Sequence, residues 1–477
     1  MILHHAAVYI GSRVFAAALN LLSAALFARL AGPETFGTYL LYLASAYIIY
    51  GFAFQWLRMS FFAIYTTDNS LSISGTFIRT ASLFVGLVAF IAALIAWSGV
   101  WSADVVAGIT IPIIGLAVFE TFYEISRARL KVNLIGLAVL LRALLVPLCG
   151  AVLYNLSGTA TGLTAGVALA HILAAAPLIR EGWSGLSARY SAEIARQYLT
   201  YGSPLILAFG INAVGQSGDR VLLAKLDSVG SVGPYGAVGD LIKQSLVVVS
   251  EAVAGSYMPH AKRAATDGDD AQTRNILTEA FRAYVFITAF GSAFIHVFAP
   301  DVVQILFGAH YAEAAASLVP YFTLATALYV FRAYYFGQAI YFLESSSAEL
   351  YASTATVAVG AVTALVLIPL YGATGAAISM LVAQAAGCLV AALAARRWRA
   401  MPLPLLDLCG IAGAALVTVG IADATALLPV SYAVSLLLEF VVLSLGAGVI
   451  VKAYDIFGLG VWAQKLVSRK LAALRTV

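Results

Sequence analysis

The chain has 477 residues, of which 62% are hydrophobic and only 10% are charged, and its formal net charge is +4. A soluble protein carries roughly 25% charged residues, so this composition excludes a soluble globular protein and predicts a polytopic helical membrane protein. Long uninterrupted apolar runs also argue against a barrel, whose strands are short and alternate. The three cysteines, Cys149, Cys388 and Cys409, fall inside apolar runs and predict neither a disulfide nor a metal motif.

Apolar runs long enough to span a membrane recur along the whole chain. A spanning helix needs roughly 20 apolar residues. Fourteen spans are predicted, at about 6–30, 35–63, 76–98, 104–126, 132–155, 159–181, 198–222, 232–260, 275–299, 314–343, 348–369, 373–395, 404–428 and 430–454. We expect Gly32-Pro33, Pro300, Gly372 and Pro429 to mark joints between spans. Residues 458–477 carry Lys465, Arg469, Lys470 and Arg475 among apolar residues, which predicts a basic amphipathic helix on the cytoplasmic membrane surface.

Basic residues are concentrated in alternate connections between the predicted spans. These connections contain Arg127, Arg129, Lys131, Arg180, Arg189, Arg196, Lys262, Arg263, Arg274, Arg396, Arg397 and Arg399. Cytoplasmic loops are the ones enriched in Lys and Arg, so both termini are predicted to be cytoplasmic.

The chain contains an internal repeat with an offset of 196 residues. Without a gap, LFARLAGPETFGTY at 26–39 matches LLAKLDSVGSVGPY at 222–235, so that Gly37 matches Gly233 and Arg29 matches Lys225. Six spans precede the second copy, so both copies enter from the same side and the repeat is parallel. The predicted domains are an N-lobe of six helices at 1–185, a C-lobe of six helices at 186–400, two further helices at 401–457, and the tail at 458–477.

Polar residues line one face of the helix that opens the second repeat. Asn212, Gln216 and Asp219 are spaced four and three residues apart, and the offset places Asn20 of the first repeat opposite Gln216. Polar side chains on a membrane helix normally face protein or water, so these residues are candidates for lining a substrate path.

Three of these segments resemble a known family. FARLAGPETFGTYLLYLAS, YGSPLILAFGINAVGQSGDRVLLAKL and LIPLYGATGAAISMLVAQAAG are similar to the polysaccharide-transporter branch of the multidrug/oligosaccharidyl-lipid/polysaccharide (MOP) exporter superfamily, which includes O-antigen and exopolysaccharide repeat-unit flippases. The resemblance implies two six-helix lobes with alternating access in the bacterial inner membrane. It implies a substrate that is an undecaprenyl-diphosphate-linked oligosaccharide, moved from the cytoplasmic to the periplasmic leaflet during lipopolysaccharide or exopolysaccharide biosynthesis. A polysaccharide polymerase and a chain-length regulator are the expected partners.

Arginines inside the spans are the candidates for binding the diphosphate. Arginine stays ionised and binds phosphate through a planar fork. Arg142 and Arg332 lie deepest and lack a carboxylate three or four residues away, whereas Arg13, Arg58 and Arg282 lie nearer the span ends. The alternative is a structural ion pair or a side chain that reaches the interface, and for Arg220, beside Asp219, the structural role is favoured.

Intramembrane carboxylates are candidates for coupling transport to an ion. Glu120 and Glu124 lie one turn apart, and Asp240 and Glu251 share a helical face. A proton relay uses such groups, but interhelical ion pairs with the arginines are the favoured alternative. No nucleotide, cofactor or metal motif is recognised, and we expect no enzyme activity.

Two rival functions remain open. A cation-coupled drug exporter of the same superfamily would favour an acidic cavity, whereas the first lobe contains more intramembrane arginines than carboxylates. An intramembrane polysaccharide polymerase or ligase would be expected to have a sizeable outer loop, and every outer connection here is short.

Overall fold

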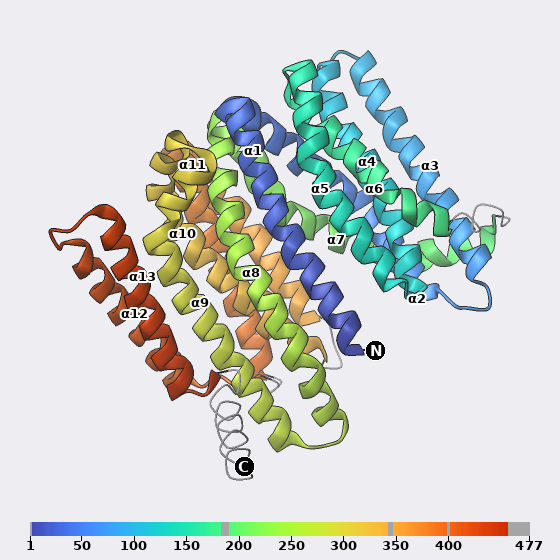
Figure 1. Cartoon of the computed structure of the whole chain (residues 1–477). Helices are drawn as coiled ribbons and strands as arrows, with labels where there is room; N and C mark the ends of the chain where they lie inside the picture. Colours follow the sequence, from blue (N-terminus) through green and yellow to red (C-terminus); the bar gives the residue numbers. More distant parts are fainter. Residues whose placement is uncertain (1, 183–189, 342–346, 398–400, 457–477) are drawn as a thin grey trace, which may run out of the picture. The chain divides into compact units, whose positions relative to one another are not determined.

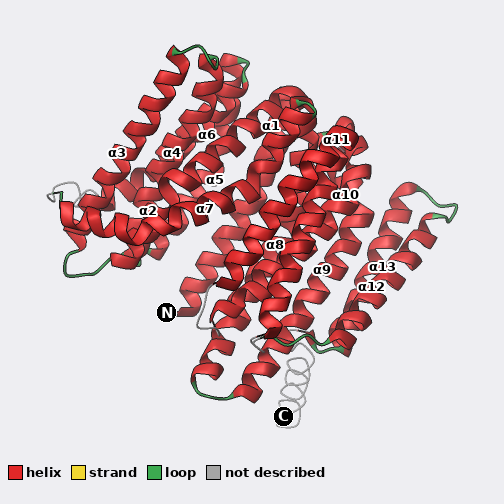
Figure 2. Cartoon of the chain, turned by 180° about the vertical axis from the view of Figure 1, so that it is seen from behind, coloured by secondary structure: helices red, strands yellow, loops and turns green. Residues whose placement is uncertain are grey.

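The computed structural model describes residues 2–182, 190–341, 347–397 and 401–456, without the side chains of 2–14, 340–341, 347–348 and 396–397. The predicted tail helix at 458–477 lies outside the described residues. Among the described residues the regular structure is helical throughout (Figure 2). The helices, shown in Figure 1, are α1 (Ile2–Tyr50), η1 (Gly51–Gln55), α2 (Trp56–Ile64), α3 (Ser70–Trp97), α4 (Ala103–Ala128), α5 (Val132–Ser157), α6 (Ala160–Gly182), α7 (Ala192–Leu226), α8 (Val229–Thr266), α9 (Asp270–Phe307), α10 (Ala309–Val330), η3 (Phe331–Tyr335), η4 (Phe336–Tyr341), α11 (Ser347–Arg397), α12 (Leu405–Ala426) and α13 (Tyr432–Ala453).

The described helices make the chain a multi-pass membrane protein. Within the described ranges, ten helical stretches are long and apolar enough to cross a membrane. Two of them, Phe15–Ile64 and Glu349–Ala395, each cover two predicted spans, and neither α7 nor α8 is among the ten. The prediction of an all-helical membrane protein is therefore confirmed, whereas the count of fourteen crossings stays a prediction.

Glycines break the two longest stretches where the sequence predicts a joint. Gly32 interrupts α1 with a φ of 73°, and Gly372 interrupts α11 with a φ of 55°. Only glycine adopts such angles at little cost. A continuous 50-residue helix would measure about 75 Å, far more than a bilayer core of about 30 Å. The break in α1 therefore allows that stretch to turn back through the membrane.

Two predicted joints are wrong. Pro300 lies inside α9, which continues to Phe307, and the chain breaks instead at Gly308, where φ is 104°. Membrane helices tolerate an internal proline because neighbouring groups satisfy the carbonyl that it frees. The connection expected between the spans at 198–222 and 232–260 shrinks to Asp227 and Ser228, because α7 and α8 both extend beyond their apolar parts.

The chain divides into two compact units. Unit 1 comprises Met1–Asp240, Val303–Ala314 and Val357–Met380, and unit 2 comprises Leu241–Val302, Ala315–Thr356 and Leu381–Val477. The lobe boundaries expected from the sequence stay a prediction. Each unit has an aromatic-rich core of its own. In unit 1, Phe61 stacks on Phe77 with ring centroids 4.3 Å apart, and in unit 2, Phe281 packs on Tyr335 at 5.2 Å.

Within unit 1, the two copies of the repeated motif touch each other. A Cβ on Gly37 would lie 2.3 Å from the carbonyl oxygen of Val229, and a Cβ on Gly233 would lie 2.6 Å from that of Pro33. Pro33 and Val229 are also related by the offset of 196, so the contact is reciprocal. A local twofold axis produces this pattern, and only glycine leaves room for it. The contact supports a parallel repeat, while superposition of the two halves stays a prediction.

Candidate functional site: a charge cluster on α2, α4 and α5

α4 places three charged side chains on one face. Glu120, Glu124 and Arg127 are spaced four and three residues apart, which brings them together along one side of a helix. Ser102 caps the start of α4 by accepting a hydrogen bond from the backbone N–H of Val105 at 3.3 Å. Arg127 lies in the last turn, where a positive charge interacts favourably with the helix dipole.

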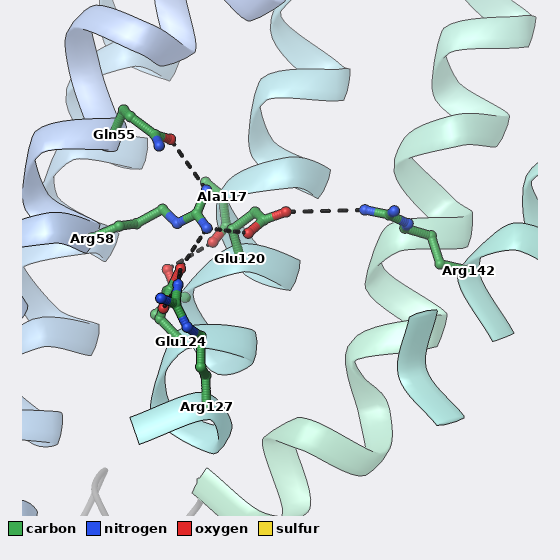
Figure 3. A network of polar contacts seen from close by, with 8 residues as sticks. Gln55, Arg58, Ala117, Glu120, Glu124, Arg127 and Arg142 are labelled. Atoms are coloured by element: carbon green, nitrogen blue, oxygen red, sulfur yellow. Dashed lines mark hydrogen bonds and ion pairs between the residues drawn. The ribbon is translucent and has the colours of Figure 1, made fainter. Parts of the chain in front are cut away.

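Arg58 reaches this face from α2. Its Nη2 donates to Glu124 Oε1 at 2.5 Å and lies 2.8 Å from Glu120 Oε2, while its Nη1 donates to Gln55 Oε1 at 3.2 Å (Figure 3). The π-helical turn η1 precedes α2 and packs closely on α7, since a Cβ on Gly51 would meet the Cβ of Ala213 at 2.5 Å. π-turns insert an extra residue into a helix and often occur at functional sites. Arg58, which lies just after this turn, thus pairs with both Glu120 and Glu124 of α4.

Arg142 approaches Glu120 from the other side, on α5. Its Nη1 lies 4.0 Å from Glu120 Oε1 (Figure 3). Its guanidinium carbon lies 5.0 Å from the ring centre of Phe119. The ring of His171 packs edge-to-face on Phe119, with ring centroids 5.7 Å apart. The Nδ1 atom of His171 lies 2.7 Å from the carbonyl oxygen of Val167, within hydrogen-bond distance. The guanidinium of Arg142 thus packs on the ring of Phe119, which in turn packs on His171. Its ion pair with Glu120 is long.

Arg127 completes the charge cluster, by which we mean Arg58, Glu120, Glu124, Arg127 and Arg142. Its Nη1 donates to both oxygens of Glu124, at 3.3 and 3.2 Å. Exposure rises from 3% for the Glu124 side chain, through 14% for Glu120, 17% for Arg58 and 24% for Arg142, to 46% for Arg127. Three arginines face two glutamates, so the cluster has a formal net charge of +1.

A surplus positive charge among membrane helices calls for an anion or water. An uncompensated buried charge costs several kcal/mol, by order of magnitude, unless it is paired or hydrated. The outermost guanidinium groups, those of Arg127 and Arg142, are also the most exposed. The arrangement is therefore suited to binding a multiply charged anion.

The other predicted arginines lie in ion pairs elsewhere. Arg332, in η3, lies 3.1 Å from Glu349, Arg282 lies 2.6 Å from Asp407, and Arg220 lies 2.5 Å from Asp240. The side chain of Arg13 lies outside the described residues. That Arg142 and Arg332 both bind one substrate stays a prediction.

The remaining polar candidates do not join the charge cluster. Glu251 accepts a hydrogen bond from the hydroxyl of Tyr334 at 3.1 Å. Asn20, Asn212 and Gln216 are exposed, and their place on a substrate path stays a prediction. Among the described residues no group of three His, Cys, Asp or Glu side chains could hold a metal ion.

Several partners were not recognised from the sequence. From the sequence, Arg127 indicates only which connections are cytoplasmic. Its position three residues after Glu124 on a helix also predicts the ion pair that the structure shows. Gln55 lies three residues before Arg58, so local spacing predicts that contact. Phe119 and Glu349 approach from other helices, and no local spacing reveals them.

Comparison with sequences yields no family for this chain. No model of a protein family matches it, and no curated protein matches it either.

Comparison of structures does find relatives in shape. Lipid II flippase MurJ, in an inward closed conformation, matches with a TM-score of 0.72 at 13% identity, covering 93% of this chain and 98% of that chain. An inward-facing multidrug resistance MATE family transporter of the MOP superfamily matches with a TM-score of 0.65 at 14% identity, over 80% of this chain and 93% of that one. A MOP superfamily transporter from Pyrococcus furiosus, whose binding pocket of reverse polarity suggests a different function, matches with a TM-score of 0.54 at 13% identity, over 83% of this chain and 95% of that one. At such low identities the likeness concerns the fold alone, and the chain has the helical fold shared by MurJ and the MATE transporters of the MOP superfamily.

Proposed function

We propose that this protein is a flippase that moves an undecaprenyl-diphosphate-linked oligosaccharide from the cytoplasmic to the periplasmic leaflet of a bacterial inner membrane. It would act by alternating access and without catalysing a reaction. The fold that it shares with lipid II flippase MurJ supports transport of a lipid-linked substrate. A polysaccharide polymerase and a chain-length regulator would be its partners in the same biosynthesis.

The observation that carries this proposal is the positive surplus of the charge cluster. The substrate's diphosphate is the group that hydrocarbon rejects most strongly, and it needs a positive, hydrated surface within the membrane. Guanidinium groups suit this role because they stay ionised and donate two parallel hydrogen bonds to phosphate oxygens. The lipid tail needs no such surface, since it remains soluble in the bilayer.

The cluster extends from the helix ends towards the membrane interior. Arg127 lies one residue before the end of α4, whereas Arg142 lies ten residues into α5, which begins at Val132, or about 15 Å at 1.5 Å per residue. On the predicted topology both helix ends are cytoplasmic. A diphosphate would therefore first contact Arg127 and then Arg142, with Arg58 and the two glutamates between them.

The test is translocation in vesicles that contain the purified protein. A fluorescent undecaprenyl-diphosphate-linked saccharide should equilibrate across the bilayer with the wild-type protein. Arg142→Gln should slow this by about tenfold or more, equivalent to the loss of one charged hydrogen bond of about 1.5–3 kcal/mol. Arg142→Lys should restore part of the rate, because lysine keeps the charge but not the fork.

The matched control is Arg196→Gln, which removes an exposed arginine near the start of α7. It should leave the rate unchanged. Full translocation by Arg142→Gln at normal insertion would refute the assignment.

Export of an organic cation is the rival function, because MATE transporters have the same fold. The same vesicles decide between the two. Uptake or efflux of a fluorescent organic cation driven by a proton or sodium gradient, without movement of the diphosphate lipid, would replace our proposal.

A further inference from the structure

The two glutamates of the charge cluster are held differently, although they lie one turn apart on α4. Glu124 is almost fully buried and accepts hydrogen bonds from both Arg58 and Arg127 at 2.5–3.3 Å. Glu120 is more exposed and is divided between Arg58 at 2.8 Å and Arg142 at 4.0 Å. Glu124 is thus fixed, whereas Glu120 is held firmly on one side only.

Of the three guanidinium groups in the charge cluster, that of Arg142 has the weakest contacts with the protein. Its distance of 4.0 Å to Glu120 is too long for a hydrogen bond. Among the described residues Arg142 forms no hydrogen bond, and its guanidinium carbon lies 5.0 Å from the ring centre of Phe119. Most of its five N–H donors are therefore available to a bound anion or to water.

We infer that Glu120 competes with an anionic ligand for Arg142 and has to be displaced when the ligand binds. This inference rests on the proposed function. A carboxylate has one negative charge, whereas a diphosphate has more charge and more acceptor oxygens, so it competes better for a guanidinium fork. Every anion that displaces Glu120 binds more weakly by the same factor, so an anion with few charges and acceptor oxygens needs a higher concentration than a diphosphate to hold Arg142.

Arg58 makes this exchange feasible. When Glu120 gives up Arg142, it remains 2.8 Å from Arg58, so no buried carboxylate is left without a cation. Glu124 also remains paired, because Arg127 holds it from the opposite side. The cluster can therefore exchange one anion for another at Arg142 while the rest of its ion pairs persist.

The test measures binding of farnesyl diphosphate and farnesyl monophosphate to the purified full-length protein in detergent. If Glu120 occupies Arg142 about nine-tenths of the time, Glu120→Gln should tighten binding of the diphosphate and of the monophosphate by about tenfold each, because both ligands have to displace the same carboxylate. The ratio of the two affinities should stay the same. Glu120→Asp, which restores the charge, should return both affinities towards the wild-type values.

The outcomes separate this inference from the proposed function. If the wild-type protein binds farnesyl diphosphate and Arg142→Gln abolishes binding, but Glu120→Gln leaves both affinities unchanged, the role of Glu120 is refuted while the flippase proposal stands. If neither ligand binds the wild-type protein and Arg142→Gln changes nothing, the diphosphate site itself is refuted. Melting in detergent serves as the folding control, and Glu120→Gln should melt close to the wild-type protein because Arg58 keeps Glu124.

Discussion

Each unit holds an arginine against a glutamate, but the two sites differ in charge and in surroundings. In unit 2, one arginine, Arg332, lies 3.1 Å from one glutamate, Glu349, and its Nη1 also donates to Ser353 Oγ at 3.3 Å. Its side chain is only 9% exposed, and a Cβ on Gly387 would come within 2.9 Å of its Cδ. Charge is balanced there, and the guanidinium is packed in place.

The charge cluster of unit 1 lacks both properties. Its three arginines outnumber its two glutamates, and exposure increases outwards to Arg142 and Arg127. The comparison teaches that an intramembrane arginine does not by itself mark a binding site. A balanced and packed arginine anchors helices to one another, whereas a surplus and partly exposed one is available to a ligand.

The largest expected effect comes from Arg58→Gln, which removes the shared partner of Glu120 and Glu124. Glu120 would keep only Arg142 at 4.0 Å and Glu124 only Arg127, and breaking the buried ion pairs of Arg58 should cost about 3–5 kcal/mol of unfolding free energy. Denaturant titration in mixed micelles should show this loss. Arg142→Gln is the comparison within the same cluster, and it should change the unfolding free energy far less because its ion pair is long. Equal destabilisation by the two variants would remove the distinction between anchor and ligand site.

The sequence predicted the class of the fold and four of the five members of the charge cluster, all except Arg127, better than their pairing. Glu120 and Glu124 were expected to share a face, and Gly32 and Gly372 were expected to break helices, because local spacing and glycine dihedral angles decide both. Arg142 was expected to lack a partner on its own helix. It does lack one there, and the carboxylate near it comes from α4.

Ion pairs between residues far apart in the sequence could not be predicted, and the reason is physical. The pairing of Arg282 with Asp407 joins residues 125 positions apart, and it depends on how α9 and α12 pack within unit 2. One sequence reports the periodicity along a helix but not which helix lies beside it. The π-turns η1 and η3, which set the phase of the residues after them, likewise follow from packing.

Arg332→Gln tests the other side of the comparison and should have an intermediate effect. Glu349 is 39% exposed, so water can hydrate it once Arg332 is gone, and we expect a loss of about 1–3 kcal/mol. If Arg332 is an anchor, its loss should lower stability and translocation together. Translocation should recover when the variant is measured at a lower temperature, where it is folded. A loss of translocation at unchanged stability would show instead that Arg332 serves the substrate.

Arg127→Gln should have the smallest effect on stability and the most informative effect on rate. Arg127 is 46% exposed and pairs with Glu124 within one helix, so its loss should cost only about 0.2–0.5 kcal/mol. If Arg127 is the first contact of an incoming anion, the variant should nevertheless slow capture of the diphosphate lipid. Because an exposed charge is screened by salt, the difference from the wild-type protein should shrink between low ionic strength and about 1 M salt. Initial rates of translocation measured in vesicles across this range provide the readout. A rate deficit that does not depend on salt would place the action of Arg127 inside the site, and unchanged rates at every salt concentration would exclude the capture role.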